Sequence, residues 1–192
     1  MIDFKSFPGY GMNLPAYRVR LRDPNADDAA RIYQWRREER IRAHQPLTSL
    51  SIEQIRTDLE RTSSNRLPDY TRDRFQWIIE RVSDNLAIGW ITLSIRTWEH
   101  LIGEIGYSIS TDFHQAGYGT EALRLILQKA FYEAQLYRVE AKCSVQNTAS
   151  YKLLEKAGFI REGVLRGYFN IRGFRVDHYL YSMLRTEFVG DF

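Results

Sequence analysis

The 192-residue chain lacks several features that would assign it to a specialised class of protein. It has one cysteine, Cys143, which excludes an internal disulfide framework and a cysteine-rich metal site. No apolar run approaches the roughly 20 residues that span a bilayer, and the first residues lack the apolar core of a signal peptide. We therefore expect a cytoplasmic protein with no membrane partner, in which Cys143 is a buried structural thiol.

A strong charge of one sign is also missing. The chain has 27 Lys and Arg against 24 Asp and Glu, and the resulting net charge of +3 is too small to predict binding to nucleic acid. The histidines are dispersed, and their spacings are not those of a metal-binding motif. We expect no metal and no nucleic-acid partner.

Hydrophobic periodicity predicts one domain over residues 17–188, preceded by an N-terminal extension, residues 1–16, which contains glycine and proline without periodicity. The predicted strands are 17–21, 75–80, 86–95, 105–109 and 137–145, with two more after residue 158. The predicted helices are 24–35, 51–60, a long helix that follows Gly119 and includes 123–134, and 147–156. This order predicts an α/β fold with one mixed sheet that has helices on both faces.

A glycine turn lies between the predicted strand 105–109 and the long helix, with Gly117 and Gly119 separated by one residue. Such a turn exposes backbone N–H groups at a helix N-terminus, where unpaired donors and the helix dipole favour an anion. It therefore predicts a phosphate-bearing cofactor. No lysine follows Gly119, which argues against a nucleoside triphosphate loop. The antiparallel order of the preceding strands argues against a dinucleotide-binding unit.

Several segments, in chain order, resemble the motifs of the GNAT acetyltransferases and, more narrowly, of their RimJ/RimL-type branch. They are Gly103–Tyr107, Gly117–Ala122, Arg138–Ala141, Asn147–Ser150 with Leu154–Phe159, and Glu162–Arg166 with Gly173–Asp177. The resemblance is strong over residues 75–188 and looser over 17–62. It implies a single-domain GNAT fold with a mostly antiparallel, twisted sheet, a splayed central pair of strands, and acetyl-CoA as co-substrate. One position departs from the family pattern, because His114 stands where the family has Gln or Arg.

The resemblance also implies which residues contact acetyl-CoA. The strand before the glycine turn pairs its free backbone groups with the pantetheine arm, and a backbone N–H of the same strand polarises the thioester oxygen. The turn holds the pyrophosphate, and the start of the next helix contacts the pantetheine and the sulfur. The residues at these positions are Ser108, Ile109 and Ser110 in the strand, His114, Gln115, Ala116, Gly117, Tyr118, Gly119 and Thr120 in the turn, and Asn147 and Ser150 at the helix start.

Two residues are candidates for the catalytic chemistry. Glu104 is the candidate general base, acting through a water molecule, because apolar neighbours on a central strand would raise the pKa of its carboxyl group. Its alternative role is a strand-edge carboxylate paired with an arginine. Many relatives protonate the leaving thiolate with a tyrosine at the position where this chain has Leu154. The RimJ/RimL branch has a serine at the position of Ser150, whose hydroxyl would bond the sulfur; otherwise Ser150 packs or bonds the helix backbone.

The leading hypothesis is an acetyl-CoA-dependent N-acetyltransferase that acts in a ternary complex on the α-amine of a protein or peptide N-terminus, with a ribosomal protein as the family's best-known acceptor. Polyamines, aminoglycosides and amino-acid analogues stay open as acceptors, since related branches use them. A catalytically inactive CoA-binding module is the non-enzymatic alternative. The segment 36–42 is net basic, which favours an acidic or neutral acceptor unless it is only a solvated surface. A homodimer is left open.

Overall fold

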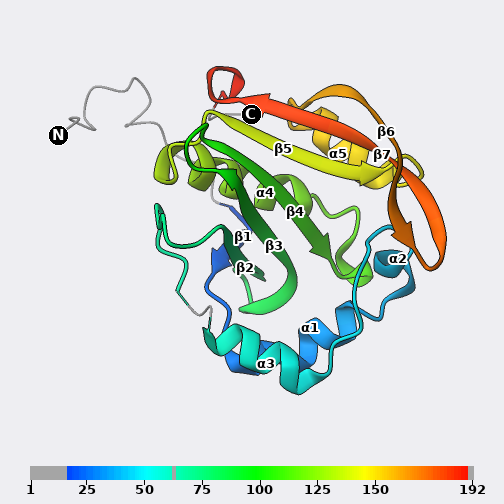
Figure 1. Ribbon diagram of the computed structural model, residues 1–192. Helices are drawn as coiled ribbons and strands as arrows, with labels where there is room; N and C mark the ends of the chain where they lie inside the picture. The colour runs from blue at the N-terminus through cyan, green and yellow to red at the C-terminus, as the bar shows by residue number, and fades with distance from the viewer. Residues whose placement is uncertain (1–16, 62–63, 190–192) are drawn as a thin grey trace.

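The computed structural model describes residues 17–61 and 64–189, so the predicted extension, residues 1–16, lies outside the described residues (Figure 1). The described chain forms one sheet in the order β1-β2-β3-β4-β5-β7-β6, in which all neighbours are antiparallel except β4 and β5. The strands are β1 Val19–Arg22, β2 Arg74–Arg81, β3 Leu86–Thr97, β4 Ile102–Ile109, β5 Arg138–Ser144, β6 Ile160–Ile171 and β7 Phe174–Leu184. The predicted α/β fold with a mostly antiparallel mixed sheet is confirmed.

Helices cover both faces of this sheet, as predicted (Figure 1). Helices α1 (Ala29–Trp35) and α3 (Ile52–Arg61) pack with Ile78 and Trp90 of β2 and β3 on what we call the front face. Helices α4 (Tyr118–Gln128) and α5 (Thr148–Lys156) lie on the opposite, back face. A short helix, α2 (Glu39–Arg42), completes the set, and single turns occur at Ala26–Asp28, Thr111–Phe113, Lys129–Glu133 and Arg185–Glu187.

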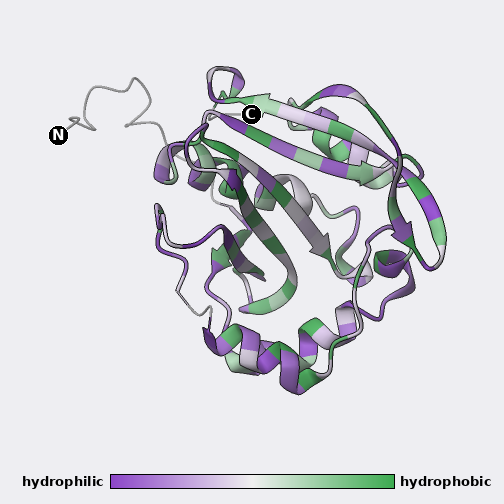
Figure 2. Ribbon diagram, viewed as in Figure 1, coloured by the Kyte–Doolittle hydropathy of each residue, from purple (hydrophilic) through white to green (hydrophobic). Residues whose placement is uncertain are grey.

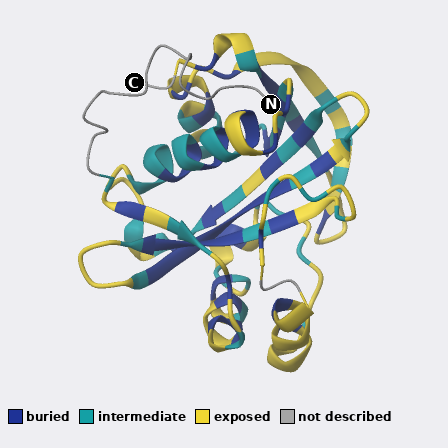
Figure 3. Cartoon of the chain, turned by 90° about the vertical axis from the view of Figure 1, so that its left-hand side faces the viewer, coloured by how far each residue is buried: buried dark blue, intermediate teal, exposed yellow. Residues whose placement is uncertain are grey.

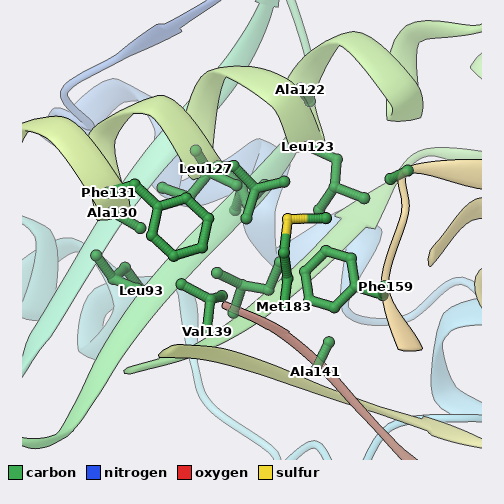
Figure 4. Close-up of a cluster of buried hydrophobic side chains, with 14 of the residues drawn as sticks. Leu93, Ala122, Leu123, Leu127, Ala130, Phe131, Val139, Ala141, Phe159 and Met183 are labelled. Carbon is green, nitrogen blue, oxygen red and sulfur yellow. The ribbon is translucent and has the colours of Figure 1, made fainter. Parts of the chain in front are cut away.

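The main core lies between α4 and the back face of the sheet (Figure 4). Leu123 and Leu127 recur at helical spacing along α4 and are almost fully buried against strand residues that include Leu93 and Val139. Full burial of each such side chain contributes about 1.5–3 kcal/mol. The packing therefore fixes α4, and with it the glycine turn at its start, firmly behind the central strands.

Local sequence signals explain several element boundaries. Ser51 and Gln54 form a reciprocal capping box ahead of α3: the Gln54 N–H donates to Ser51 Oγ at 3.1 Å, and the Ser51 N–H donates to Gln54 Oε1 at 2.8 Å. Gly158 has a φ of +89° just after α5, the left-handed conformation that glycine favours at a helix end. No sequence pattern predicted α2, which lies inside the arginine-rich segment 36–42.

The distribution of hydrophobic residues agrees with this layering. Hydrophobic residues are frequent along β2, β3 and α4 (Figure 2), and these elements are rich in buried positions, whereas the outer surfaces of the helices are exposed (Figure 3). Within residues 17–61 and 64–189, none of the helices combines the length and the apolar character that a membrane crossing requires.

The contact between the two parallel strands is short. The register of β4 with β5 runs from Ile102–Arg138 to Ile105–Ala141, and beyond it β4 continues to pair with β3 while β5 continues to pair with β7. The predicted splay of the central pair is therefore confirmed. The gap that opens between the two strands exposes strand edges inside the sheet, a common location for a ligand site.

Candidate active site

The backbone groups of β4 alternate between its two neighbours. The N–H of Ser110 donates to a carbonyl of β3 at 2.9 Å, and the carbonyl of Leu101 accepts at 2.8 Å from the residue before β5. The backbone N–H and C=O groups of even-numbered residues therefore point toward β3, and those of odd-numbered residues point toward β5. Beyond the paired stretch, the groups that face the gap are those of Tyr107 and Ile109. Of the three strand residues expected to pair with pantetheine, Ile109 has backbone groups on the gap side, whereas those of Ser108 and Ser110 face β3.

Both gap-facing carbonyls accept hydrogen bonds from side chains of the chain itself. Gln45 Nε2 donates to the carbonyl of Tyr107 at 3.1 Å, and His114 Nε2 donates to the carbonyl of Ile109 at 2.9 Å. Since a carbonyl only accepts, His114 must carry a proton on Nε2. A ligand that pairs with this strand edge has to displace these two side chains or share the oxygens with them.

The turn before α4 has the conformation of an anion-binding loop. Gln115 and Gly117 have φ values of +62° and +84°, and left-handed residues of this kind occur in backbone nests that bind anions. The N–H of Thr120 donates to Gly117 O at 3.1 Å, while the N–H groups of Tyr118 and Gly119 have no acceptor among the described residues. These two donors and the helix dipole would suit a pyrophosphate.

Arg18, just ahead of β1, braces this turn. Its backbone N–H and Nε donate to the two carboxylate oxygens of Glu121 at 2.6 and 2.7 Å, and its Nη2 donates to Ala116 O at 2.9 Å. The guanidinium lies 5.1 Å from the centre of the Tyr118 ring, and a Cβ at Gly117 would lie 2.8 Å from Nη2. Glu121 is in the first turn of α4, where its charge would repel a bound anion. Arg18 therefore both fixes the turn and compensates that charge.

Glu104 lies on the front face where the gap opens. Its Oε2 accepts from Lys142 Nζ on β5 at 2.5 Å and lies 3.6 Å from Arg96 Nη1. The Lys142 side chain is only 7% exposed, and its ammonium lies 5.6 Å from the centre of the Tyr168 ring. The carboxylate is thus ion-paired, as its alternative role requires, but mainly with a lysine that reaches across the two parallel strands.

Ser150 lies on the back face, beside the same gap. Its Oγ is 2.9 Å from the hydroxyl of Tyr107, and its N–H donates to Asn147 Oδ1 at 3.2 Å, which caps α5. Burial raises the pKa of the Tyr107 hydroxyl well above its ordinary value, so the group keeps its proton at neutral pH. Leu154 is buried in the core. Burial also raises the pKa of the Cys143 thiol to about 11, which makes it the inert buried thiol that we expected.

The gap is open beyond the last β4–β5 pair, and we call this open end its mouth. One segment, residues 38–48, crosses the mouth on the front face, and we call it the bridge. At its start, Glu38 accepts from Ser110 Oγ and from the N–H of Thr111, both at 2.9 Å. The next residue, Glu39, forms a two-pronged ion pair with Arg172 at 2.6 and 2.7 Å. The bridge therefore connects the end of β4 to the tip of the β6–β7 hairpin, which lies beside α2 in Figure 1.

Two neighbouring hollows flank the bridge and share Ile171 and Arg172 of the hairpin tip. The larger, about 640 Å³, lies between the bridge, the end of β5 and the hairpin, and Val145 and Arg175 contribute to its lining. The smaller, about 210 Å³, is lined largely by the bridge itself, including Gln45. Since Gln45 also bonds the gap edge of β4, the hollows open beside the mouth of the gap.

The site includes residues that sequence reasoning missed. Tyr107 and Lys142 lie within predicted strands, and their alternation with neighbouring residues was a usable signal for the face on which each lies. Gln45 and Arg18 come from segments far from the motifs in the chain, and Arg172 directly precedes the motif Gly173–Asp177; no local pattern marks any of the three.

Comparison with known proteins adds a family to this geometry. The model of the acetyltransferase (GNAT) domain matches residues 18–160. The N-acetyltransferase p20 of Bacillus licheniformis is 27% identical over 173 residues, which cover 90% of this chain and 96% of that one. The structure of RimJ from Mycobacterium smegmatis in complex with CoA-disulfide matches with a TM-score of 0.78 at 25% identity, covering 90% of this chain and 85% of that one. The structure of spermidine N-acetyltransferase from Vibrio cholerae, in complex with CoA and spermine, is similar in fold, with a TM-score of 0.76, 18% identity, and coverage of 88% and 97%.

Proposed function

The chain belongs to the GNAT acetyltransferase family, and on that premise we propose that it transfers the acetyl group of acetyl-CoA to the α-amine of a protein or peptide N-terminus in a ternary complex. The observation that carries the proposal is the gap between β4 and β5. It offers a strand edge in the middle, the carboxylate of Glu104 on the front face, and the hydroxyl pair of Tyr107 and Ser150 on the back face.

The described residues fit acetyl-CoA both along the gap edge of β4 and at the glycine turn. The gap-facing backbone groups of Tyr107 and Ile109 can pair with the amides of a pantetheine arm, and Asn147 lies at the edge of the same gap. The unpaired N–H groups of Tyr118 and Gly119 suit the pyrophosphate. Acetyl-CoA, when bound, supplies the activated acetyl group. Its binding and orientation come from these groups.

Groups on the two faces of the gap have different roles in the reaction. On the front, Glu104 takes through a water molecule the proton that the attacking amine loses. In the middle, a gap-facing N–H of β4 donates to the carbonyl oxygen on which negative charge develops. On the back, the hydroxyl pair of Tyr107 and Ser150 donates a hydrogen bond to the departing sulfur, which leaves as a thiolate and takes its proton from water. The carbon–nitrogen bond thus forms as the carbon–sulfur bond breaks, and Lys142 holds Glu104 in place.

A small-molecule amine is the second candidate acceptor. The larger hollow, at about 640 Å³, is within the roughly 300–1,000 Å³ range of small-ligand pockets. The likeness in fold to a spermidine acetyltransferase is compatible with this candidate.

Thiol release from acetyl-CoA, measured with a panel of peptide and small-molecule amines, tests the proposal. We expect turnover with peptide N-termini. Glu104→Gln should lower kcat at least about tenfold for a lysine amine and less for an α-amine, because their reference pKa values are near 10.4 and 8. Ser150→Ala should lower kcat about tenfold by weakening the hydrogen bond to the departing sulfur.

Glu140→Gln is the matched control, because Glu140 is the register neighbour of Glu104 on β5 and is bonded to Arg138. Full activity of both Glu104→Gln and Ser150→Ala would show that the catalytic assignments are wrong. Tight binding of CoA without thiol release from any amine would instead identify an inactive CoA-binding module.

A further inference from the structure

The carboxylates around the mouth of the gap are already engaged by the protein. Glu104 is paired with Lys142 and Arg96. The other partners are Ser110 and Thr111 for Glu38, Arg172 for Glu39, and the N–H of Gly167, at 2.7 Å, for Asp177. Glu38 and Asp177 accept from uncharged donors and keep their negative charge, but among the described residues the cations Arg42, Arg96, Lys142, Arg172 and Arg175 outnumber the carboxylates Glu38, Glu39, Glu104 and Asp177 here. The mouth therefore has no excess of negative charge that would attract an acceptor carrying several positive charges.

Two arginines beside the mouth of the gap have fewer partners than these carboxylates. Arg42 lines the smaller hollow and Arg175 the larger one, and both are exposed. Within the described chain, neither lies within ion-pair distance of a carboxylate. The charge of Arg42 helps to lower the pKa of Glu39, which is itself paired with Arg172, and Arg175 makes a long contact of 3.4 Å with Gly167 O. A guanidinium has five donors in a fork that matches a carboxylate. The two hollows therefore present unpaired cations on either side of the hairpin tip.

We propose that this site selects acceptors that carry a carboxylate near the amine, and that Arg42 and Arg175 are the selecting residues. The inference rests on the proposed function, since it names the class of amine that the same site takes. A polyamine gains no net attraction at this mouth and is repelled by Arg42 and Arg175, whereas an acidic peptide can pair with these two guanidinium groups.

The geometry of β5 sets the distance between the amine and the carboxylate. Val145 lines the larger hollow and follows Lys142, the partner of Glu104, by three residues. At about 3.3 Å per strand residue, this separation is about 10 Å. An extended peptide covers that distance in about three residues. An acceptor with its α-amine at Glu104 therefore places the side chain of its third or fourth residue at the hollow, where Asp or Glu would meet Arg175.

The experiment uses three peptides that differ only at their third and fourth residues, which are Glu-Glu, Gln-Gln or Lys-Lys, together with spermidine. We expect kcat/KM for thiol release to be about tenfold higher for the Glu-Glu peptide than for the Gln-Gln peptide, and lower again for the Lys-Lys peptide and spermidine. The Glu-Glu to Gln-Gln ratio should shrink as salt is raised. In the variant with both Arg42→Gln and Arg175→Gln, the ratio should fall to about one.

Arg161→Gln is the control, because Arg161 lies over Tyr179 on the other side of the β6–β7 hairpin, 4.8 Å from the ring centre, and should keep the ratio. A wild-type ratio of one, or a preference for spermidine, would overturn the inference and leave acetyl transfer intact. Binding of labelled peptides, measured by fluorescence anisotropy, separates the two proposals. If no peptide turns over but wild type still binds the Glu-Glu peptide more tightly than the double variant does, carboxylate selection stands and the proposed function fails.

Discussion

The glycine turn and the bridge both lie at the open end of the gap, on opposite faces of the sheet, and they are built differently. The turn is a continuous stretch whose proposed binding groups are backbone N–H groups, held in place by the buried face of α4. The bridge is held by side chains whose partners are distant in the chain, since Glu38 bonds a residue 72 positions later and Glu39 one 133 positions later. A backbone site tolerates many side-chain changes, whereas a side-chain site can change its specificity while the fold persists.

The largest expected effect comes from comparing two left-handed glycines, one in the glycine turn and one in the hairpin tip that the bridge contacts. Gly117 has a φ of +84° beside Arg18, and Gly173 has a φ of +88° at the hairpin tip with no atom within 4 Å of an added Cβ. Gly117→Val should weaken CoA binding about 100-fold, because strain and displacement of Arg18 disturb the N–H donors. Gly173→Val should leave CoA affinity within about twofold. Isothermal titration with CoA measures both, and equal losses would contradict the difference in construction.

A second test concerns the brace of the glycine turn. Arg18→Met should weaken CoA binding about tenfold, or about 1.4 kcal/mol, because it leaves the Glu121 carboxylate uncompensated at the start of α4. The variant with both Arg18→Met and Glu121→Gln should recover most of this loss. If the double variant binds CoA as weakly as Arg18→Met alone, the brace acts through the shape of the turn and not through its charge.

Gln45 joins the bridge to the gap, since it bonds the carbonyl of Tyr107 on β4 and lines the smaller hollow. Gln45→Ala frees the carbonyl of Tyr107 and loosens the bridge. We expect CoA to bind about threefold more tightly and the KM for the acceptor to rise by a similar factor. Steady-state kinetics together with titration of CoA would show this opposite movement. Weaker binding of CoA would mean that Gln45 supports the cofactor.

The smallest expected effect concerns Glu162 on β6 and its partners on the neighbouring strands. The Arg138 guanidinium and the Ser182 hydroxyl hold the pKa of Glu162 down at about 2. Because the folded-state pKa lies below the unfolded one, the stabilisation is present above about pH 4.5 and is lost as the pH falls toward 2. The side chain is 37% exposed, so the effect should stay below about 1 kcal/mol.

Thermal melts of wild type and Glu162→Gln should therefore differ slightly at neutral pH and converge in acid, while CoA affinity at pH 7 stays the same. A difference in Tm that persists unchanged at pH 2 would show that Glu162 stabilises the hairpin without its charge.

The features that the sequence predicted well depend on local physics. The capping pair Ser51 and Gln54, the glycine turn and the periodicity of α4 all act over a few residues, so their patterns are visible in the chain. The splay of β4 and β5 was predicted from the family resemblance alone, because neither composition nor spacing indicates where two parallel strands stop pairing.

The acceptor side could not be predicted in the same way. Helix α2 has only four residues, too few to show a helical period among the arginines. The lysine that pairs with Glu104 is on the adjacent parallel strand, and only the three-dimensional register brings it there. The backbone groups of Ser108 and Ser110 point toward β3 because of the register between β3 and β4, and this register is likewise set in three dimensions.

The two side-chain bonds over the gap have a consequence for the solubility of the chain. An unpaired strand edge recruits strands from other molecules, and proteins protect such edges with side chains that discourage pairing. Gln45 and His114 occupy both gap-facing carbonyls before acetyl-CoA arrives, so they act as gatekeepers against edge-to-edge aggregation. A chain with Gln45→Ala and His114→Ala should scatter more light on warming than wild type does, and CoA should suppress the difference. The atoms that make the gap a binding site are also those that make it an aggregation hazard.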